Sequence, residues 1–452
     1  MLKYRGYLAA IVIVYFGAVI LFWLHGDPAM VGIFERAQGV PPVMGPWLYQ
    51  PYAHAPVPFI DLVGIFSWRE CYLQGIDVTL HNPCDIIPRG PANYSPIVWH
   101  LPTEWLGLRN PIPAAIALNS AFLAIVVFLF EPRNYRDLAI AALAILSPPV
   151  FYAVERSNLD LVIFVLAVGA MLLPQRKLLS RLVFYICAVA SGLLKLYPFA
   201  LLLALVREPV RRFLALSVLS LIVIGVFLSD HWAFITHLVL PKERTSGMFG
   251  GKIFANGLQE LFGLSDTGRA VFYLSCCLIS AAISILIAAR IKDDSKFRDG
   301  LDRASSLLLC GGILVLGCFF SGLSIYYRAV FLLPVLAGLL SLRLSFHSSA
   351  MQKLIPLAVL VTMLCLYGDR MRALGMALLH PGVIEPSSGY GVGLATVILV
   401  VKELFWWSEV TILAGIILAL LIHFPMGVAF FKSPIFRKWK GPSSKVAVSP
   451  VT

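Results

Sequence analysis

Four groups of ionisable side chains stand in otherwise apolar parts of the sequence. They are Asp61, the pair Glu155 and Arg156, Lys195, and Arg328. Arginine and lysine hold phosphate oxygens through charge-assisted hydrogen bonds, and a carboxylate can accept the proton of an attacking hydroxyl. Because ionisable residues are costly in a bilayer, they mark functional sites there. Together the four groups favour chemistry on an anionic, lipid-linked substrate.

Each group also has a purely structural interpretation. Asp61 suits a solvated helix face or a helix cap, and Glu155 with Arg156 suits a local ion pair at the end of a span. Lys195 and Arg328 could extend to the membrane interface. Both cations lie beside breaks in apolar runs, however, and this position favours a functional role for them.

Other polar residues give weaker signals. Asp160 falls one turn inside an apolar segment, where a helix start favours an anion in any case. Cys71 and Cys84 share a polar loop and either form a disulfide or remain two thiols. No pair of histidines outside the membrane has the spacing of metal ligands, so we expect no metal and no cofactor. These histidines are His54, His81 and His100.

The rest of the chain is typical of a helical membrane protein. Of its 452 residues, 59% are hydrophobic and 13% are charged, whereas about 25% are charged in a soluble domain. Apolar runs recur that can cross a hydrocarbon core of about 30 Å as helices. We predict an all-α polytopic membrane protein with about 12 transmembrane helices, the first of them an uncleaved span. The predicted spans are 7–24, 113–130, 138–154, 158–173, 182–194, 197–206, 213–228, 270–289, 305–321, 325–342, 354–367 and 405–424.

The charge distribution orients these spans. The chain carries 36 Lys and Arg against 24 Asp and Glu, a net charge of +12. The segments on the side of the N-terminus hold 22 of the basic and 7 of the acidic residues, so that side carries +15 and the remainder −3. This positive-inside pattern predicts cytoplasmic N- and C-termini. Nucleic acid is therefore not needed as a partner to explain the basic character.

Two parts of the topology stay open. Spans 182–194 and 197–206 are short and have basic outer flanks, which favours a hairpin that crosses only part of the membrane. The alternative is one kinked helix. Segment 389–401 is either a further span, which would move the C-terminus outside, or an interfacial segment.

We expect a single integral-membrane domain, 1–430, followed by a basic cytoplasmic tail, 431–452. Its first extracytoplasmic loop, 25–112, is rich in proline and aromatic residues, which suits helices lying in the membrane interface. A loop of this length is usually functional or has structure of its own. Segment 229–269 forms a second outer loop.

Several short motifs follow one another between residues 55 and 340. They are Asp61, Gly75-Ile-Asp77, Asn93-Tyr-Ser-Pro96, Glu155-Arg-Ser-Asn-Leu-Asp160, Leu194-Lys-Leu-Tyr-Pro198 and Ser324-Ile-Tyr-Tyr-Arg328. In type and order they resemble motifs of the integral-membrane C-type glycosyltransferases of family 87, the bacterial polyprenol-phosphate-mannose-dependent α-mannosyltransferases and their relatives. The chain differs from that pattern at Thr79, Ser95, Ser157 and Arg328, where the family has Tyr, Pro, Gly and often His.

The resemblance implies a fold of about a dozen helices in the bacterial inner membrane, with the active site facing the periplasm. It implies inverting transfer of a sugar, mannose in the family, from a polyprenyl-phosphate donor to a lipid or glycan acceptor. Asp61 would be the general base, and Lys195, Arg328 and Arg156 would bind the donor phosphate. We expect a monomer. The residues expected to contact the sugar or acceptor are Glu155, Asn93, Tyr94, Asn158, Tyr197 and Tyr327.

Two other classes of protein fit parts of the sequence. A secondary transporter or lipid flippase also uses broken helices with buried charges, but the candidate charges here all map to one predicted side of the membrane. An O-antigen-type polymerase or ligase is polytopic and uses lipid-pyrophosphate donors. Its large loop normally comes late in the chain, whereas the long loop here comes first.

Overall fold

The structure is a computed structural model that describes residues 2–25, 59–84, 94–100, 111–237, 248–292, 301–322, 324–343, 349–379 and 392–431. Nearly all of these residues are helical, which confirms the all-α prediction. Within them, two strands of two residues each, β1 (Met248–Phe249) and β2 (Ser324–Ile325), pair antiparallel. Asn93, His54 and the tail from residue 432 onwards lie outside the described residues.

Seven of the described helices are long and apolar enough to cross a membrane on their own. They are α1 (Leu2–His25), α6 (Pro111–Leu129), α11 (Val210–His237), α13 (Asp266–Ile291), α14 (Arg303–Ser321), α16 (Ser349–Leu379) and α17 (Val392–His423). An eighth span results if α7 (Tyr135–Ile145) and α8 (Pro148–Arg156), bent by 45° from each other, are counted as one. The chain is therefore a multi-pass membrane protein.

The other predicted spans are shorter helices. They are α9 (Leu159–Met171), α10 (Leu178–Leu194), the 3-10 helix η2 (Tyr197–Arg207), and the 3-10 helix η4 (Tyr326–Phe331), which continues into α15 (Leu332–Leu342). Most residues of α9 and α15 are buried inside the protein. All twelve predicted segments are thus at least partly helical, but length and composition alone do not qualify twelve of them as spans.

Two helix boundaries differ from those predicted from hydropathy. The predicted span 138–154 divides because α8 begins at Pro148, and proline has no backbone N–H to continue the preceding helix. Segment 389–401 proves to be neither a separate span nor a separate interfacial element. From Val392 onwards it is the first part of the continuous helix α17.

Helices α10 and η2 form a hairpin. Arg181 at the start of α10 and Glu208 just after η2 form a salt bridge of 2.5 Å, so the two outer ends lie together. Lys195 stands at the turn between them with an extended backbone. The hairpin is confirmed and the alternative of one kinked helix is wrong, whereas its partial crossing of the membrane stays a prediction.

Helix α14 occupies the centre of the bundle, in contact with α9, α15, α17 and η2. Two glycines allow α14 and α15 to approach closely. A Cβ atom on Gly311 would lie 2.9 Å from the backbone nitrogen of Val335, and one on Gly338 would lie 3.0 Å from the carbonyl oxygen of Ala304. Small residues of this kind are common where membrane helices pack.

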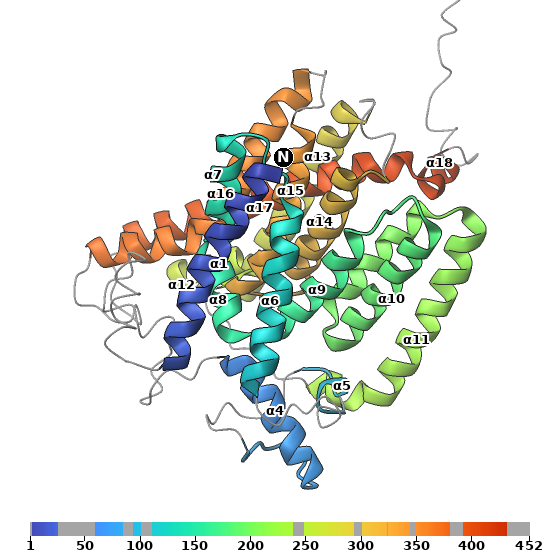
Figure 1. Ribbon diagram of the computed structural model, residues 1–452. Coiled ribbons are helices and arrows are strands. Elements are labelled where there is room, and N and C mark those ends of the chain that lie inside the picture. The colour runs from blue at the N-terminus through green and yellow to red at the C-terminus, as the bar shows by residue number, and fades with distance from the viewer. Residues whose placement is uncertain are drawn as a thin grey trace, which may run out of the picture.

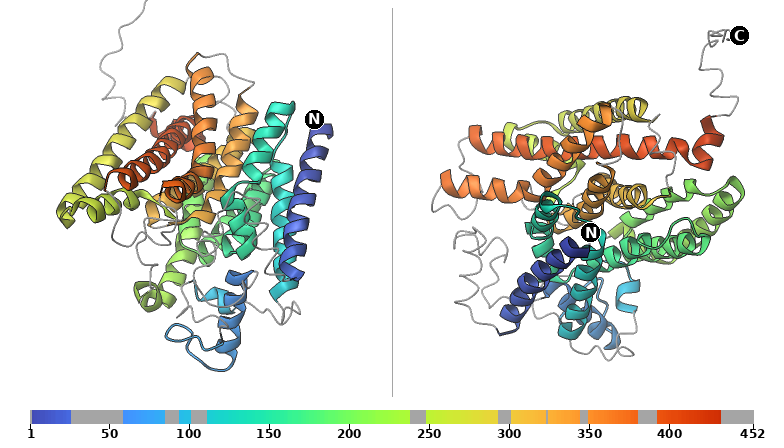
Figure 2. Two further views of the ribbon diagram at one scale, coloured as in Figure 1. Left: turned by 90° about the vertical axis from the view of Figure 1, so that its left-hand side faces the viewer. Right: turned by 45° about the horizontal axis from the view of Figure 1, so that its top comes forward.

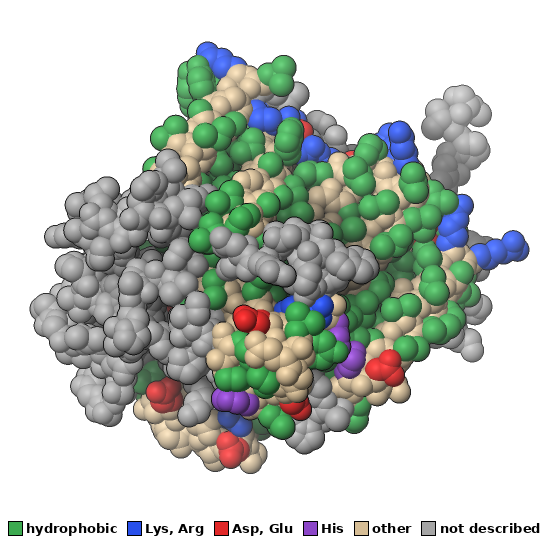
Figure 3. All heavy atoms as spheres, turned by 60° about the horizontal axis from the view of Figure 1, so that its bottom comes forward, with side chains coloured by type: hydrophobic (Ala, Val, Ile, Leu, Met, Phe, Trp, Pro, Cys, Tyr) green, Lys and Arg blue, Asp and Glu red, His purple; other side chains and the backbone are tan. Residues whose placement is uncertain are grey.

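The two ends of the bundle differ in their contacts. At one end Glu131 accepts ion pairs from Arg5 and Arg303, each at 3.3 Å. At the other lie α4 (Ile60–Leu73) and the short α5 (Ile97–His100), at the bottom of Figure 1 and below the N-terminus of α1 in Figure 2. In the oblique view from this second end, hydrophobic side chains cover much of the flanks, and most of the visible acidic and histidine side chains gather around the end itself (Figure 3).

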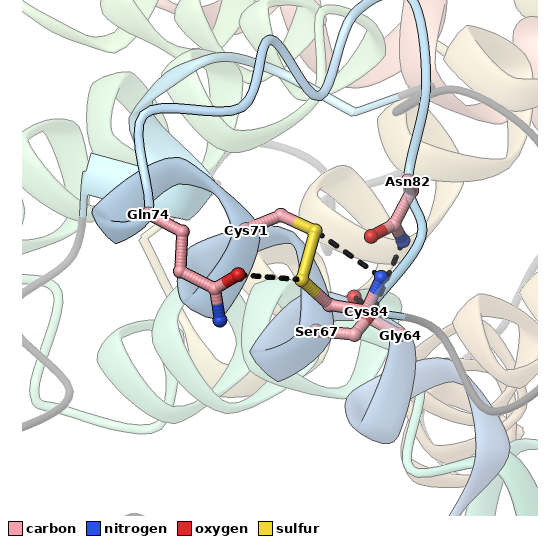
Figure 4. The surroundings of a disulfide bond; sticks show 6 residues. All are labelled: Gly64, Ser67, Cys71, Gln74, Asn82 and Cys84. Carbon is pink, nitrogen blue, oxygen red and sulfur yellow. Dashed lines mark hydrogen bonds between the residues drawn. A yellow bond between two sulfur atoms is a disulfide. The ribbon is translucent and has the colours of Figure 1, made fainter.

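A disulfide closes the segment that follows α4 (Figure 4). Cys71 and Cys84 are joined with their Cα atoms 5.7 Å apart, so the interpretation as two thiols is wrong. Asn82 from this segment donates to the Ser67 hydroxyl on α4 at 3.0 Å. A small apolar cluster that includes Trp68 packs beneath, separate from the main core. Helix α12 (Gly251–Phe262) lies within predicted loop 229–269, and α18 (Pro425–Phe431) follows α17.

Candidate functional site

Asp61 lies buried in the first turn of α4 and faces the end of α8. The two helices are tied together because the Phe59 amide donates to the carbonyl oxygen of Glu155 at 2.8 Å. Arg156 then binds both carboxylate oxygens of Asp61, through Nε at 2.9 Å and Nη2 at 2.6 Å. This bidentate geometry fixes the position of both charges.

The break between α8 and α9 brings two motif residues, Arg156 and Asn158, to the same carboxylate. Ser157 has a φ of 46°, in the left-handed region, which ends α8. Asn158 caps α9 by accepting the Asp160 amide at 2.8 Å, and its Nδ2 donates to Asp61. Asn119 on α6 holds the break in place with bonds of 3.0 Å to the Val154 carbonyl and the Ser157 hydroxyl.

Asn158 also links Asp61 to a second carboxylate cluster. Its Oδ1 accepts from Lys195 Nζ at 3.2 Å. Lys195 in turn donates to Asp160 at 2.7 Å, and the Tyr197 hydroxyl donates to the other Asp160 oxygen at 2.5 Å. Arg328 completes the group with its Nε 3.5 Å from Asp160. The turn of the hairpin, the start of α9 and η4 therefore meet at Asp160.

Aromatic rings surround the cations. Lys195 Nζ lies 4.5 Å from the centre of the Tyr94 ring and 6.0 Å from that of Tyr327. Arg156 lies over Tyr152 at 5.3 Å, and Arg328 lies over Tyr197 at 5.2 Å. These distances are within the range of cation–π attraction.

The charges of this network do not cancel among its direct contacts. Three cations, Arg156, Lys195 and Arg328, contact two carboxylates, Asp61 and Asp160. These five residues leave one positive charge in excess. The Tyr94 hydroxyl adds no negative charge to the network, because burial, together with the nearby charge of Asp61, raises its pKa. Glu155, next to Arg156 in the chain, adds a further buried carboxyl close to these five residues.

Most of the predicted site residues come together here: Asp61, Tyr94, Arg156, Asn158, Lys195, Tyr197, Tyr327 and Arg328. Glu155 is buried, and the contact of its backbone with α4 is described above. The roles proposed for these side chains stay predictions. Asn93 lies outside the described residues.

Three participants were not predicted. Asp160 was interpreted as a residue that suits a helix start, although its place in the Glu-Arg-Ser-Asn-Leu-Asp motif was a usable signal. Tyr152 lies one turn before Arg156, a spacing that brings side chains together on a helix. Asn119 and its neighbour Ser120 are polar residues in the otherwise apolar α6, and Asn119 could have been noted on that ground. Among the described residues, no group of three or more His, Cys, Asp and Glu could hold a metal ion.

Comparisons with protein-family models, with curated proteins and with solved structures found no match for this chain.

Proposed function

We propose that the chain is an integral-membrane glycosyltransferase that transfers a sugar, mannose by its resemblance, from a polyprenyl-phosphate donor to a hydroxyl of a lipid or glycan acceptor. The observation that carries the proposal is the buried network in which three cations contact Asp61 and Asp160. Such a network supplies both requirements of the reaction, a positive site for the leaving phosphate and a carboxylate for the proton.

The proposed reaction is a single displacement with inversion. The acceptor oxygen forms a bond to the anomeric carbon, and the bond from that carbon to the phosphate oxygen breaks. The electron pair leaves with the polyprenyl phosphate, whose charge Lys195 and Arg328 stabilise. The proton of the acceptor hydroxyl passes to Asp61, which Arg156 and Asn158 hold in a fixed orientation. Fixed orientation of the reacting groups is itself a large part of catalysis.

The position of the network favours chemistry over transport. It lies where α4, α8, α9, η2 and η4 begin or end, with Asp160 in the first turn of α9. Transporter sites commonly lie near the bilayer midplane, between helices that give access to both sides. Helix α14 separates the network from the opposite end of the bundle. Its first residue, Arg303, forms an ion pair with Glu131, whereas Ser324 and Arg328 follow its last turn, about 28 Å away at 1.5 Å per residue.

We place the site on the extracytoplasmic face of a bacterial plasma membrane. The distribution of basic residues supports cytoplasmic termini. The disulfide Cys71–Cys84 starts from α4, the helix that also carries Asp61 of the network, and disulfides persist in oxidising compartments.

The direct test is the variant Asp61→Asn in isolated membranes supplied with a radiolabelled polyprenyl-phosphate sugar. Loss of a general base lowers the rate about 10²- to 10⁴-fold, whereas Asp230→Asn, at an exposed position on α11, should leave it unchanged. Full activity of Asp61→Asn at equal protein level would exclude the base assignment. Transfer from undecaprenyl-pyrophosphate glycans, with none from the phosphate donor, would favour the polymerase class instead.

A further inference from the structure

A second group of buried charges lies far from the site in sequence. Lys402 on α17 is 2% exposed, and its Nζ lies 3.1 Å from a carboxylate oxygen of Glu403 and 3.6 Å from one of Asp369. The same nitrogen donates a hydrogen bond of 2.7 Å to the carbonyl oxygen of Met248 in strand β1. The lysine therefore lies between two carboxylates and also holds a strand.

Helix α17 contacts the neighbouring residue of the same strand as well. Trp406, one turn after Lys402, stacks on Phe249 with ring centres 4.1 Å apart and an interplanar angle of 6°. Both residues of β1 are buried. A strand of two residues is too short to be stable alone, so its place depends on these two contacts with α17 and on its partner strand.

The partner strand leads directly to Arg328. In the antiparallel pair, Met248 lies opposite Ile325, and Phe249 lies opposite Ser324. The buried Ser324 hydroxyl donates to the Cys318 carbonyl at 2.9 Å and accepts from Arg328 Nη1 at 3.0 Å. The strand pair thus determines where Ser324 presents its oxygen to the guanidinium of Arg328.

We propose that Lys402 is a positioning residue for Arg328, acting through β1 and β2 without touching the donor. The proposal rests on the proposed function, because it assigns Lys402 a share in the binding of the donor phosphate. Its physical basis is a continuous series of contacts from Lys402 Nζ through the Met248 carbonyl and the strand pair to Ser324 and Arg328. A guanidinium binds a phosphate well only when its planar donors are correctly oriented.

The experiment compares the kinetics of purified variants in detergent with the polyprenyl-phosphate sugar as the varied substrate. Lys402→Met should raise the donor KM about tenfold, the effect of weakening one charge-assisted hydrogen bond, with little change in kcat. Lys402→Arg keeps a cationic donor and should restore most of the affinity. Lys252→Met, at an exposed position on the adjoining helix α12, is the matched control and should not change KM.

Two further variants separate positioning from general destabilisation. Lys402→Met combined with Glu403→Gln removes one buried carboxylate along with the cation and should show the same rise in KM. Phe249→Leu removes the stacking on Trp406 and no charge, and should shift KM in the same direction. In the background of Arg328→Gln, Lys402→Met should have no additional effect on KM, because contacts that act through one residue are not additive.

Each outcome decides one question. If Arg328→Gln raises KM but Lys402→Met does not, the positioning role is wrong and the proposed donor site stands. If Arg328→Gln leaves KM unchanged, the proposed donor site itself is wrong. If Lys402→Met lowers activity equally with and without Arg328, its role is structural only, and the positioning proposal is overturned.

Discussion

Removal of the Asp160 carboxylate gives the sharpest stability test of the network. Asp160 is fully buried and contacts Lys195 at 2.7 Å and Arg328 at 3.5 Å. At an effective dielectric constant of about 20, Coulomb's law gives about 6 and 5 kcal/mol for these two distances. The cost of burying the charges offsets much of this attraction, and removal of one partner of a buried ion pair typically costs about 3–5 kcal/mol. We therefore expect Asp160→Asn to lower the free energy of unfolding by about that amount.

The measurement is unfolding of the purified protein in mixed micelles, followed by tryptophan fluorescence. Asp266→Asn is the control, because Asp266 forms an exposed 3.3 Å pair with Arg269, and such surface pairs contribute about 0–1 kcal/mol. The double variant Asp160→Asn/Lys195→Met should lose less than the sum of the two single variants, because Lys195 is then no longer a buried charge without its carboxylate. A loss for Asp160→Asn no larger than that of the control would refute the view that these charges are desolvated and coupled.

Two further predictions concern the scaffold. Gly311→Ala should destabilise the protein by about 1–3 kcal/mol, because the added methyl group would overlap α15. The control Gly225→Ala, where an added methyl group meets no atom within 4 Å, should be neutral or slightly stabilising. Equal free energies of unfolding for the two variants would contradict the close packing of α14 on α15. Cys71→Ser should lower the free energy of unfolding of the region around α4 by about 3 kcal/mol, because it opens a short covalent loop. The measurement is the rate of proteolysis between residues 59 and 84, which should rise. Cys187→Ser on α10 is its control, and equal cleavage rates would count against a stabilising role of the disulfide.

Most members of the network could be predicted, because charged residues are easy to recognise within an apolar sequence. Asp61, Arg156, Lys195 and Arg328 interrupt or border hydrophobic runs, and the structure brings them into one network. Their pairing was not predictable, since it depends on the left-handed break at Ser157 and on the depth of the hairpin turn. Asp160 was missed because an acidic residue at a helix start has a sufficient local explanation.

Helix lengths were harder to predict than helix positions. Hydropathy locates the apolar centre of α16 but not its ends, since the helix runs from Ser349 to Leu379, well beyond the predicted 354–367. Lys402 was overlooked because the predicted span began after it, at residue 405. Beside the adjacent Glu403, its partners include a backbone carbonyl more than 150 residues away and a carboxylate on a neighbouring helix. The charged pair in an apolar run was a usable signal, but the two distant contacts have no local sequence pattern.

The hairpin of α10 and η2 has a consequence for how a lipid would reach Lys195. Its two arms measure about 26 and 22 Å at the rises of α- and 3-10 helices, which is less than the hydrocarbon thickness of about 30 Å. If the open end of the hairpin lies at the opposite membrane surface, as the proposed topology requires, Lys195 would lie several ångströms below the level of the phospholipid headgroups on its own side. The lipid phosphate of the proposed donor would then have to descend into the bilayer, or the bilayer would have to thin locally around this part of the protein.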